Sequence, residues 1–347
     1  MSDAAEPAGG AGDRVLLTGI SGFVGGHVAL QLLQAGYTVR GSVRDLSRAE
    51  KVRDTLGRAG ADTRKLEFVR LDLLEDQGWS EAMEGVRFLQ HTASPFVLGT
   101  PKDPQELIRP AFDGTRRAVS AALASGVERI VLTSSVAAIQ YGHPSNERLL
   151  TEADWTVLDS AATGAYPRSK TLAEQEAWRL VDAAGRHDDL AVINPAAIFG
   201  PLLDEDPGTS AQVVGLLLGG KIPALPRLTL SVVDVRDVAA LHLAAMTDPA
   251  FAGQRCIASV GTYSLRELGD MLRPAFPRRR IPRAQIPNWL VGLAAPFSRR
   301  LRENMSELTS VKRLDGARAP QRLARQLILA ADAVTATGRS LEAHKLI

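Results

Sequence analysis

Residues 15–27 read VLLTGISGFVGGH, an apolar run followed by three spaced glycines, Gly19, Gly22 and Gly25. The run predicts a strand, and the residues after it predict an apolar helix that closes at Gly36. Glycine lets the backbone turn tightly and approach a pyrophosphate, and a helix N-terminus offers unpaired N–H groups and a positive dipole end. The spacing G-x-x-G-x-x-G is one residue longer than the commoner dinucleotide loop. The stretch predicts a dinucleotide-binding turn, although a glycine trio can also be a purely structural turn.

The chain around this stretch alternates strand-like and helix-like segments through its first two hundred residues. Such alternation predicts an α/β fold, a Rossmann-type doubly wound parallel sheet with right-handed crossovers. Residues 190–200, LAVINPAAIFG, are interpreted as one strand of that sheet. The predicted organisation has a disordered tail at 1–13 and a dinucleotide-binding Rossmann domain at 14–200. Residues 201–347 form mainly a smaller C-terminal substrate-binding lobe, with a segment near 229–247 returning to the Rossmann domain.

The composition excludes several classes of protein. The 347 residues are 45% hydrophobic and 23% charged, and the net charge of +2 gives no reason to expect a nucleic-acid partner. Cys256 is the single cysteine, so no internal disulfide can form, and a reducing compartment fits. The first dozen residues lack the apolar run of a signal peptide, and no stretch approaches the ~20 apolar residues that cross a bilayer. We expect a soluble, cytoplasmic protein without a membrane partner, either a monomer or a homodimer.

The second predicted strand carries the residues that distinguish NAD from NADP. It ends TVRGSVRD, so that Arg40 and Arg44 point to one face while Asp45 points the other way. Arginine accommodates a ribose 2′-phosphate, whereas an acid there accepts bonds from the 2′-hydroxyl. The cations favour NADPH, with Arg44 as the phosphate partner. Asp72 follows the third strand, where it can bond the adenine amino group or only cap the next turn.

A second motif, YPRSK at 166–170, places Tyr166 and Lys170 one turn apart on a predicted helix, with Pro167 in its first turn. Many helices carry such a pair without a function, and a tyrosine there is often core packing. Between the two motifs, RIVLTSS predicts a strand that ends in Ser134 and Ser135. Alternation along a strand points these serines in opposite directions, so that one of them can reach the pair, and Ser135 is favoured.

Four motifs in this order, TGISGFVG, TSS, YPRSK and NPAAIFGP, carry a family likeness. They resemble the extended short-chain dehydrogenase/reductase family, and within it the dihydroflavonol and cinnamoyl-CoA reductases with their microbial aldehyde and ketone reductase relatives. The likeness runs from about residue 14 to about residue 275. It implies NADPH as cofactor and the reversible reduction of a carbonyl group to an alcohol.

The resemblance also implies roles for individual residues. Arg44 and Lys51 match residues that hold the 2′-phosphate, Asp72 matches the adenine contact, and Pro195 matches a proline beside the nicotinamide. Gln140 stands where the flavonoid enzymes carry an asparagine, which speaks against a flavonoid substrate. Ser135, Tyr166 and Lys170 match the catalytic trio. The candidate cofactor contacts are Thr18, Gly19, Gly22, Phe23, Val24, Gly25, Arg44, Lys51, Asp72, Leu73, Thr92, Ala93, Ser94, Tyr166, Lys170 and Pro195, and the candidate substrate contacts are Ser135, Gln140 and Tyr166.

The proposed chemistry needs a proton donor for the alkoxide that hydride transfer creates. Tyr166 is that donor, and a nearby ammonium on Lys170 is expected to lower the phenol's pKa from its usual ~10. Two alternatives stay open, an NAD-dependent nucleotide-sugar epimerase or dehydratase and a non-catalytic NADP-binding sensor. His91 and His143 lack partners at ligand spacing, so no metal is expected, and no G-x-S-x-G elbow surrounds the serines.

Overall fold

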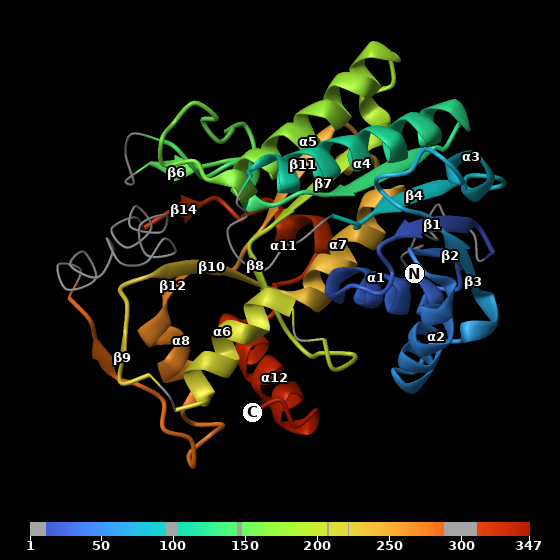
Figure 1. Ribbon diagram of the computed structural model, residues 1–347. Coiled ribbons are helices and arrows are strands. Elements are labelled where there is room, and N and C mark those ends of the chain that lie inside the picture. The colour runs from blue at the N-terminus through green and yellow to red at the C-terminus, as the bar shows by residue number, and fades with distance from the viewer. Residues whose placement is uncertain (1–11, 95–102, 144–147, 207, 221, 288–310) are drawn as a thin grey trace, which may run out of the picture.

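The computed structural model describes residues 12–94, 103–143, 148–206, 208–220, 222–287 and 311–347. Its centre is a seven-stranded sheet in which every pair of neighbours runs parallel, as Figure 1 shows. From edge to edge its strands are β11 (Gln254–Ala258), β7 (Leu190–Pro195), β5 (Arg129–Thr133), β4 (Phe88–His91), β1 (Arg14–Thr18), β2 (Thr38–Val43) and β3 (Leu66–Arg70). The predicted Rossmann-type doubly wound sheet is thereby confirmed. Its strand order reverses between β1 and β4, where such folds bind ligands.

Helices cover both faces of this sheet because its strands are apolar on both sides. In β1, Val15 and Leu17 pack into one core and Leu16 into the other. One face carries α1 (Phe23–Gln34), α2 (Ala49–Arg58), α7 (Val235–Thr247) and α11 (Arg318–Leu323), and the other carries α3 (Trp79–Ala82), α4 (Gln105–Ala124) and α5 (Ala165–Ala183).

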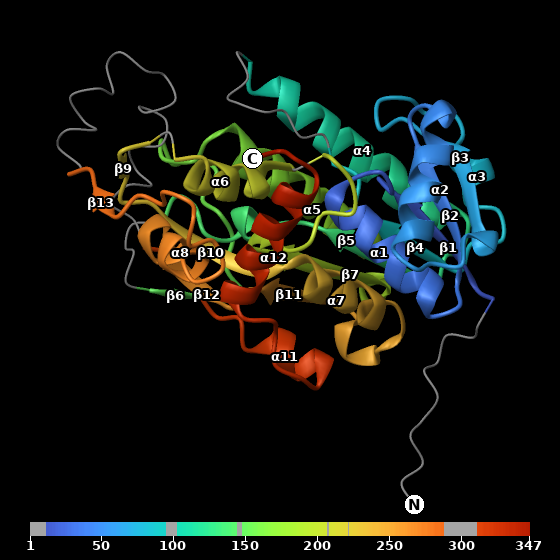
Figure 2. The same ribbon diagram turned by 90° about the horizontal axis from the view of Figure 1, so that it is seen from below.

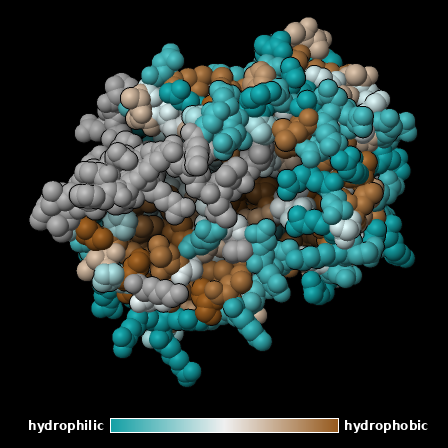
Figure 3. Space-filling view, viewed as in Figure 1, coloured by the Kyte–Doolittle hydropathy of each residue, from teal (hydrophilic) through white to brown (hydrophobic). Residues whose placement is uncertain are grey.

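A smaller lobe lies beyond the carboxyl ends of the sheet, as the two ribbon views show. Its own core includes Phe199, Leu217 and Leu268, all fully or almost fully buried. Apolar side chains also reach the surface over the lobe and around a hollow beside it in Figure 3. The elements of the lobe are the sheet of β8 (Ala197–Phe199), β10 (Thr229–Asp234) and β12 (Gly261–Ser264), and the helices α6 (Gly208–Leu218), α8 (Leu265–Leu272) and α12 (Ala330–Ala343).

Two short parallel pairs and several single turns complete the fold. The pairs are β13 (Ala284–Gln285) with β9 (Ala224–Leu225) and β14 (Arg313–Leu314) with β6 (Leu149–Leu150). The 3-10 turns are Leu46–Arg48, Thr63–Lys65, Val136–Ala138, His187–Asp189 and Pro249–Phe251. In the part of the chain that the structure describes, no helix has the length and apolarity needed to span a bilayer.

Two features differ from the sequence interpretation. The predicted single strand at 190–200 is wrong: it is two strands, β7 in the large sheet and β8 in the lobe. Pro195 has no N–H for the ladder, whereas the N–H of Ala196 still donates to the carbonyl of Ala258 in β11, at 3.0 Å, before the chain enters β8. In the segment near 229–247, expected to return to the Rossmann domain, α7 packs on α1, whereas β10 pairs with β8 and β12. The seventh strand of the large sheet is β11. Of the predicted tail at 1–13, residues 1–11 lie outside the described chain.

Candidate active site

The glycine motif forms a tight cradle where β1 meets α1. Gly19 adopts φ +72°, and its carbonyl accepts a bond from the Gly22 N–H at 3.0 Å. A Cβ on Gly25 would lie 2.1 Å from the Gly19 carbonyl oxygen, so that no larger residue fits there. Gly22 caps α1 without a side-chain bond, and the first turn holds no acidic residue. The N–H groups of this turn are therefore available to an anion, which fits the pyrophosphate of a dinucleotide.

The last residue of β4 and the two residues after it contact the end of β1, beside the glycine turn. Thr92 donates its hydroxyl to the Thr18 carbonyl at 2.7 Å, and the Ala93 N–H donates to Thr18 Oγ1 at 3.2 Å. His91 bonds Thr18 Oγ1 through Nδ1 at 2.8 Å. Ser94 lines a second pocket with Lys170, and residues 95–102 lie outside the described chain. The structure thus brings these candidate cofactor residues together at the switch point of the sheet.

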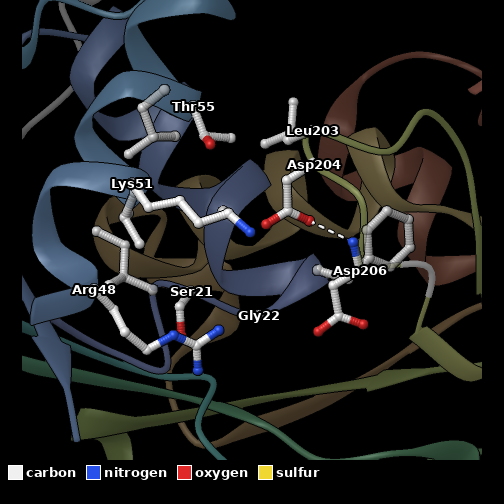
Figure 4. A pocket seen from close by; sticks show the side chains of 13 residues that line it. Ser21, Gly22, Arg48, Lys51, Thr55, Leu203, Asp204 and Asp206 are labelled. Carbon is white, nitrogen blue, oxygen red and sulfur yellow. Dashed lines mark hydrogen bonds between the residues drawn. The ribbon is translucent and has the colours of Figure 1, made fainter. Parts of the chain in front are cut away.

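A pocket of about 560 Å³ opens beside the cradle. Two cationic side chains and two carboxylates, those of Asp204 and Asp206, line it, as Figure 4 shows. Gly22 and Phe23 line it from α1, and Arg48 and Lys51 line it from the first residues of α2 and the turn before them. The ammonium of Lys51 points toward the carboxylate of Asp204 across the pocket. Arg48 was missed by the sequence reasoning, although it precedes Lys51 by three residues and so shares its helical face.

Other candidate cofactor residues lie apart from this pocket. Arg44 stands exposed just after β2 and is not among the residues that line it. Asp72 accepts the N–H of Leu74 at 2.9 Å, which is the turn-capping role left open from the sequence. Leu73 packs beside Gly114 of α4, where a Cβ would meet it at 2.9 Å. Val24 lies in the first turn of α1.

Ser135, Tyr166 and Lys170 converge at the carboxyl ends of β5 and β7. Helix α5 begins at Ala165, which places Pro167 in its first turn and puts Tyr166 and Lys170 on one face. Ser135 is hydrogen-bonded to Tyr166, and its Oγ also accepts the Ala137 N–H at 3.1 Å. Ser134 points the other way, where its hydroxyl donates to the buried Glu174. The two serines are thus divided as strand alternation predicts.

The pKa of Tyr166 is shifted in the direction opposite to the one expected from the sequence. Burial raises the pKa of Tyr166, and the hydrogen bond from Ser135 acts in the opposite direction. The predicted lowering by Lys170 is therefore wrong for this structure. The reason is burial of the phenol, whose raising effect exceeds the lowering effect of the hydrogen bond. Burial also lowers the pKa of Lys170, to about 8, against a raising effect of Glu174. Its Nζ lies 3.5 Å from the Thr133 carbonyl oxygen.

Three candidate residues remain: Gln140, and the histidines His91 and His143, which are both hydrogen-bonded. The side-chain oxygen of Gln140 is buried and has no hydrogen-bond partner among the residues that the structure describes. A buried acceptor in that state costs free energy until a donor reaches it. His91 bonds Thr18, and His143 Nε2 bonds the Ile139 carbonyl at 2.7 Å. Among the described residues, no three His, Cys, Asp or Glu side chains are grouped to hold a metal ion.

Comparison with known proteins identifies the family of this chain. The family model described as the NAD dependent epimerase/dehydratase family matches residues 15–261, most of the chain. The chain belongs to that family. A cinnamoyl-CoA reductase of Medicago truncatula is 36% identical over 278 residues, which cover 78% of this chain and 83% of the relative. A putative NADPH-dependent methylglyoxal reductase of Candida albicans is 30% identical over 76% of this chain and 83% of its own.

A solved structure gives the same fold. Yeast methylglyoxal/isovaleraldehyde reductase Gre2, complexed with NADPH, superposes with a TM-score of 0.78 at 24% identity, covering 96% of this chain and all of that one. The resemblance drawn from the four motifs is confirmed, and so is the expectation that this member of the epimerase/dehydratase family is an oxidoreductase.

Proposed function

We propose that the protein catalyses the reversible, NADPH-dependent reduction of an aldehyde or ketone to an alcohol. The observation that carries this proposal is the hydrogen-bonded pair of Ser135 and Tyr166, one helical turn from Lys170 and beside the glycine cradle. NADPH as cofactor is supported by the relative described as NADPH-dependent and by the NADPH-bound structural neighbour. Arg48 and Lys51, at the mouth of the cradle, supply the positive charge that a 2′-phosphate needs.

In this mechanism the bound cofactor supplies a hydride to the carbonyl carbon. The protein's own residues handle the oxygen. Ser135 donates a hydrogen bond to that oxygen as negative charge develops there. Tyr166 gives the oxygen its phenolic proton, and the ammonium of Lys170 stabilises the tyrosinate that remains. Burial excludes water from the group, which strengthens each of these interactions.

The substrate is a small carbonyl compound. The side-chain oxygen of Gln140, unpaired among the described residues, favours a substrate that carries a hydrogen-bond donor, such as a hydroxyl group. A donor that reaches this oxygen would satisfy the buried acceptor, and a substrate without one would leave it unpaired.

A second candidate is a nucleotide-sugar epimerase or dehydratase, which the description of the matching family favours. Such an enzyme would return its hydride within each cycle and consume no free cofactor. The cations at the cofactor pocket and the two relatives named as reductases speak for net reduction.

The decisive experiment measures NADPH and NADH oxidation by the full chain against a panel of aliphatic and aromatic aldehydes and ketones. We expect turnover with NADPH and a loss of about 10²–10⁴ in rate for Tyr166→Phe. Tyr37→Phe is the matched control, because Tyr37 lies just before β2, at the opposite end of the sheet. Tight cofactor binding without net oxidation by any carbonyl would favour the epimerase instead.

A further inference from the structure

A buried carboxylate lies one helical turn after Lys170. The side chain of Glu174 is 0% exposed, and it forms an ion pair with Arg255 of β11, Nε to Oε1, at 2.6 Å. Asn194 Nδ2 donates to its other oxygen at 2.8 Å, and the Ser134 hydroxyl donates to the same oxygen. A buried carboxylate is stable only when charges and donors of this kind surround it.

Two partners of Glu174, Ser134 and Asn194, directly precede residues of the candidate active site. Ser134 precedes Ser135 in the chain, and Asn194 precedes Pro195. Asn194 also donates to the Ser135 carbonyl at 3.3 Å. One carboxylate therefore ties together the ends of β5, β7 and β11 beneath the reacting groups.

Arg255 makes several buried contacts besides its ion pair with Glu174. Its Nη1 donates to the carbonyls of Glu152 at 2.7 Å and Asp154 at 2.6 Å, and its guanidinium lies 3.9 Å from the centre of the Trp155 ring. These contacts hold the guanidinium in place independently of its ion pair with Glu174.

Lys170 and Glu174 share a pocket of about 250 Å³ between the sheet, α4 and α5. The other lining residues are uncharged, with Thr115 from α4, Thr133 and Ser134 from the end of β5, and Ala93 and Ser94 after β4. The titratable groups near Lys170 are Tyr166 on its own helix and His91 at the end of β4, whose pKa burial and then Lys170 lower to about 3, so that it is neutral. The one anion facing the ammonium among these elements is Glu174, which acts on the pKa of Lys170 in the raising direction.

We propose that Glu174, held by Arg255, Asn194 and Ser134, is a positioning residue that keeps Lys170 protonated at the pH of catalysis and fixes the strand ends that carry Ser135 and Pro195. This inference rests on the proposed reductase function only for its kinetic readout. A neutral Lys170 could not stabilise the tyrosinate, so activity would fall as Lys170 loses its proton.

The test compares wild type with Glu174→Gln, Glu174→Asp and the double variant Glu174→Gln/Arg255→Gln. Glu174→Gln removes the anion and leaves Arg255 as an unpaired buried cation, which lowers the pKa of Lys170 further. We expect the alkaline limb of the kcat profile to move to lower pH by about one unit. Glu174→Asp keeps the charge and should leave that limb near its wild-type position. Glu176→Gln is the matched control, because Glu176 is also buried on α5 but pairs with Arg179.

A second readout needs neither cofactor nor turnover. Competitive acetylation with acetic anhydride labels only neutral amines, and peptide mass spectrometry compares Lys170 with the exposed Lys51 of the same chain. We expect the labelling midpoint of Lys170 to fall by about one pH unit in Glu174→Gln and to stay in place in Glu176→Gln. The labelling result does not depend on whether the wild type reduces a carbonyl. The Glu174 proposal and the reductase proposal can therefore be contradicted independently.

The double variant covers the possibility that Glu174→Gln does not fold, since breaking a buried ion pair is costly whereas removing both charges is not. In the double variant the labelling midpoint should also fall, by less than in the single one. An unchanged midpoint in the folded variant, or an equal shift in Glu174→Asp, would overturn the proposal. An equal shift in Glu174→Asp would mean that the position of the Glu174 carboxylate, and not its charge, sets the pKa of Lys170.

Discussion

Gly25 stacks on Gly19 so closely that a Cβ at position 25 would lie 2.1 Å from the Gly19 carbonyl oxygen. The same Cβ would lie 2.9 Å from the Thr92 hydroxyl. Backbone occupies the first of these positions and cannot move aside as a flexible side chain would. The spacing of the glycines is therefore a packing requirement between β1, α1 and the end of β4.

Gly25→Ala is expected to weaken NADPH binding at least tenfold, because the turn that presents its N–H groups must open to admit the methyl group. Titration of NADPH fluorescence measures this. Gly57→Ala is the control, since Gly57 lies in α2 and its added Cβ would meet Thr63 at 3.8 Å, an ordinary contact. Wild-type NADPH affinity in Gly25→Ala would show that the cradle does not hold the cofactor.

Arg48 and Lys51 are expected to set the preference for NADPH. Replacing either by Gln removes one charged hydrogen-bond donor from the pocket, a loss of about 1.5–3 kcal/mol, or roughly ten- to a hundredfold in the KM for NADPH. The KM for NADH should change little, because NADH has no 2′-phosphate. Arg64→Gln is the control, as that side chain is 88% exposed and pairs with Asp62. Equal losses with both cofactors would assign these residues a structural role instead.

Local patterns in the sequence predict much of this molecule. The glycine spacing predicts the turn after β1, and the four-residue spacing of Tyr166 and Lys170 predicts their shared helical face. Alternation along a strand separates Ser134 from Ser135. Each of these depends on contacts between residues close in sequence, whose geometry is set by the helix or strand alone.

The features that the sequence does not predict all depend on packing between segments that are far apart in the chain. Arg255 is 81 residues from Glu174, and nothing local marks the two as partners. The place of β11 at the sheet edge and the turn of Pro195 into β8 depend equally on where the lobe packs. The direction of the Tyr166 pKa shift was wrong for the same reason, since burial is a property of the whole fold.

Within the lobe, Thr337 of α12 is hydrogen-bonded to Gly200, which follows β8, and this contact gives a prediction about stability. Its hydroxyl accepts the Gly200 N–H at 2.8 Å and lies 3.0 Å from the Gly200 carbonyl, all of it buried. Thr337→Val keeps the shape but leaves the Gly200 N–H unpaired, at a cost of about 1–3 kcal/mol in the free energy of unfolding. Urea denaturation measures this, with Thr335→Val on the same helix as the control. An unchanged midpoint would mean that the bonds to Gly200 add no stability.

Lys170 is needed for the proposed activity, but its burial is expected to lower the free energy of unfolding. Its folded-state pKa of about 8 lies below the ordinary value of 10.5, so between these values the unfolded chain binds a proton that the folded protein has released. Stability contributed by this group therefore rises with pH across that window, and below pH 8 the whole penalty is present. Lys170→Met removes the penalty.

The variant should accordingly be inactive yet more stable than wild type at pH 7, by about 3 kcal/mol, with the difference shrinking as pH rises from about 8 towards 10.5. Urea midpoints of both proteins at pH 7 and pH 9.5 measure it. Lys65→Met is the control, because Lys65 donates to the Gly36 carbonyl at 2.9 Å and its loss should give no such gain. A variant that is less stable than wild type at pH 7 would contradict the prediction, since it would mean that the ammonium stabilises the folded state by its contacts more than its burial destabilises it.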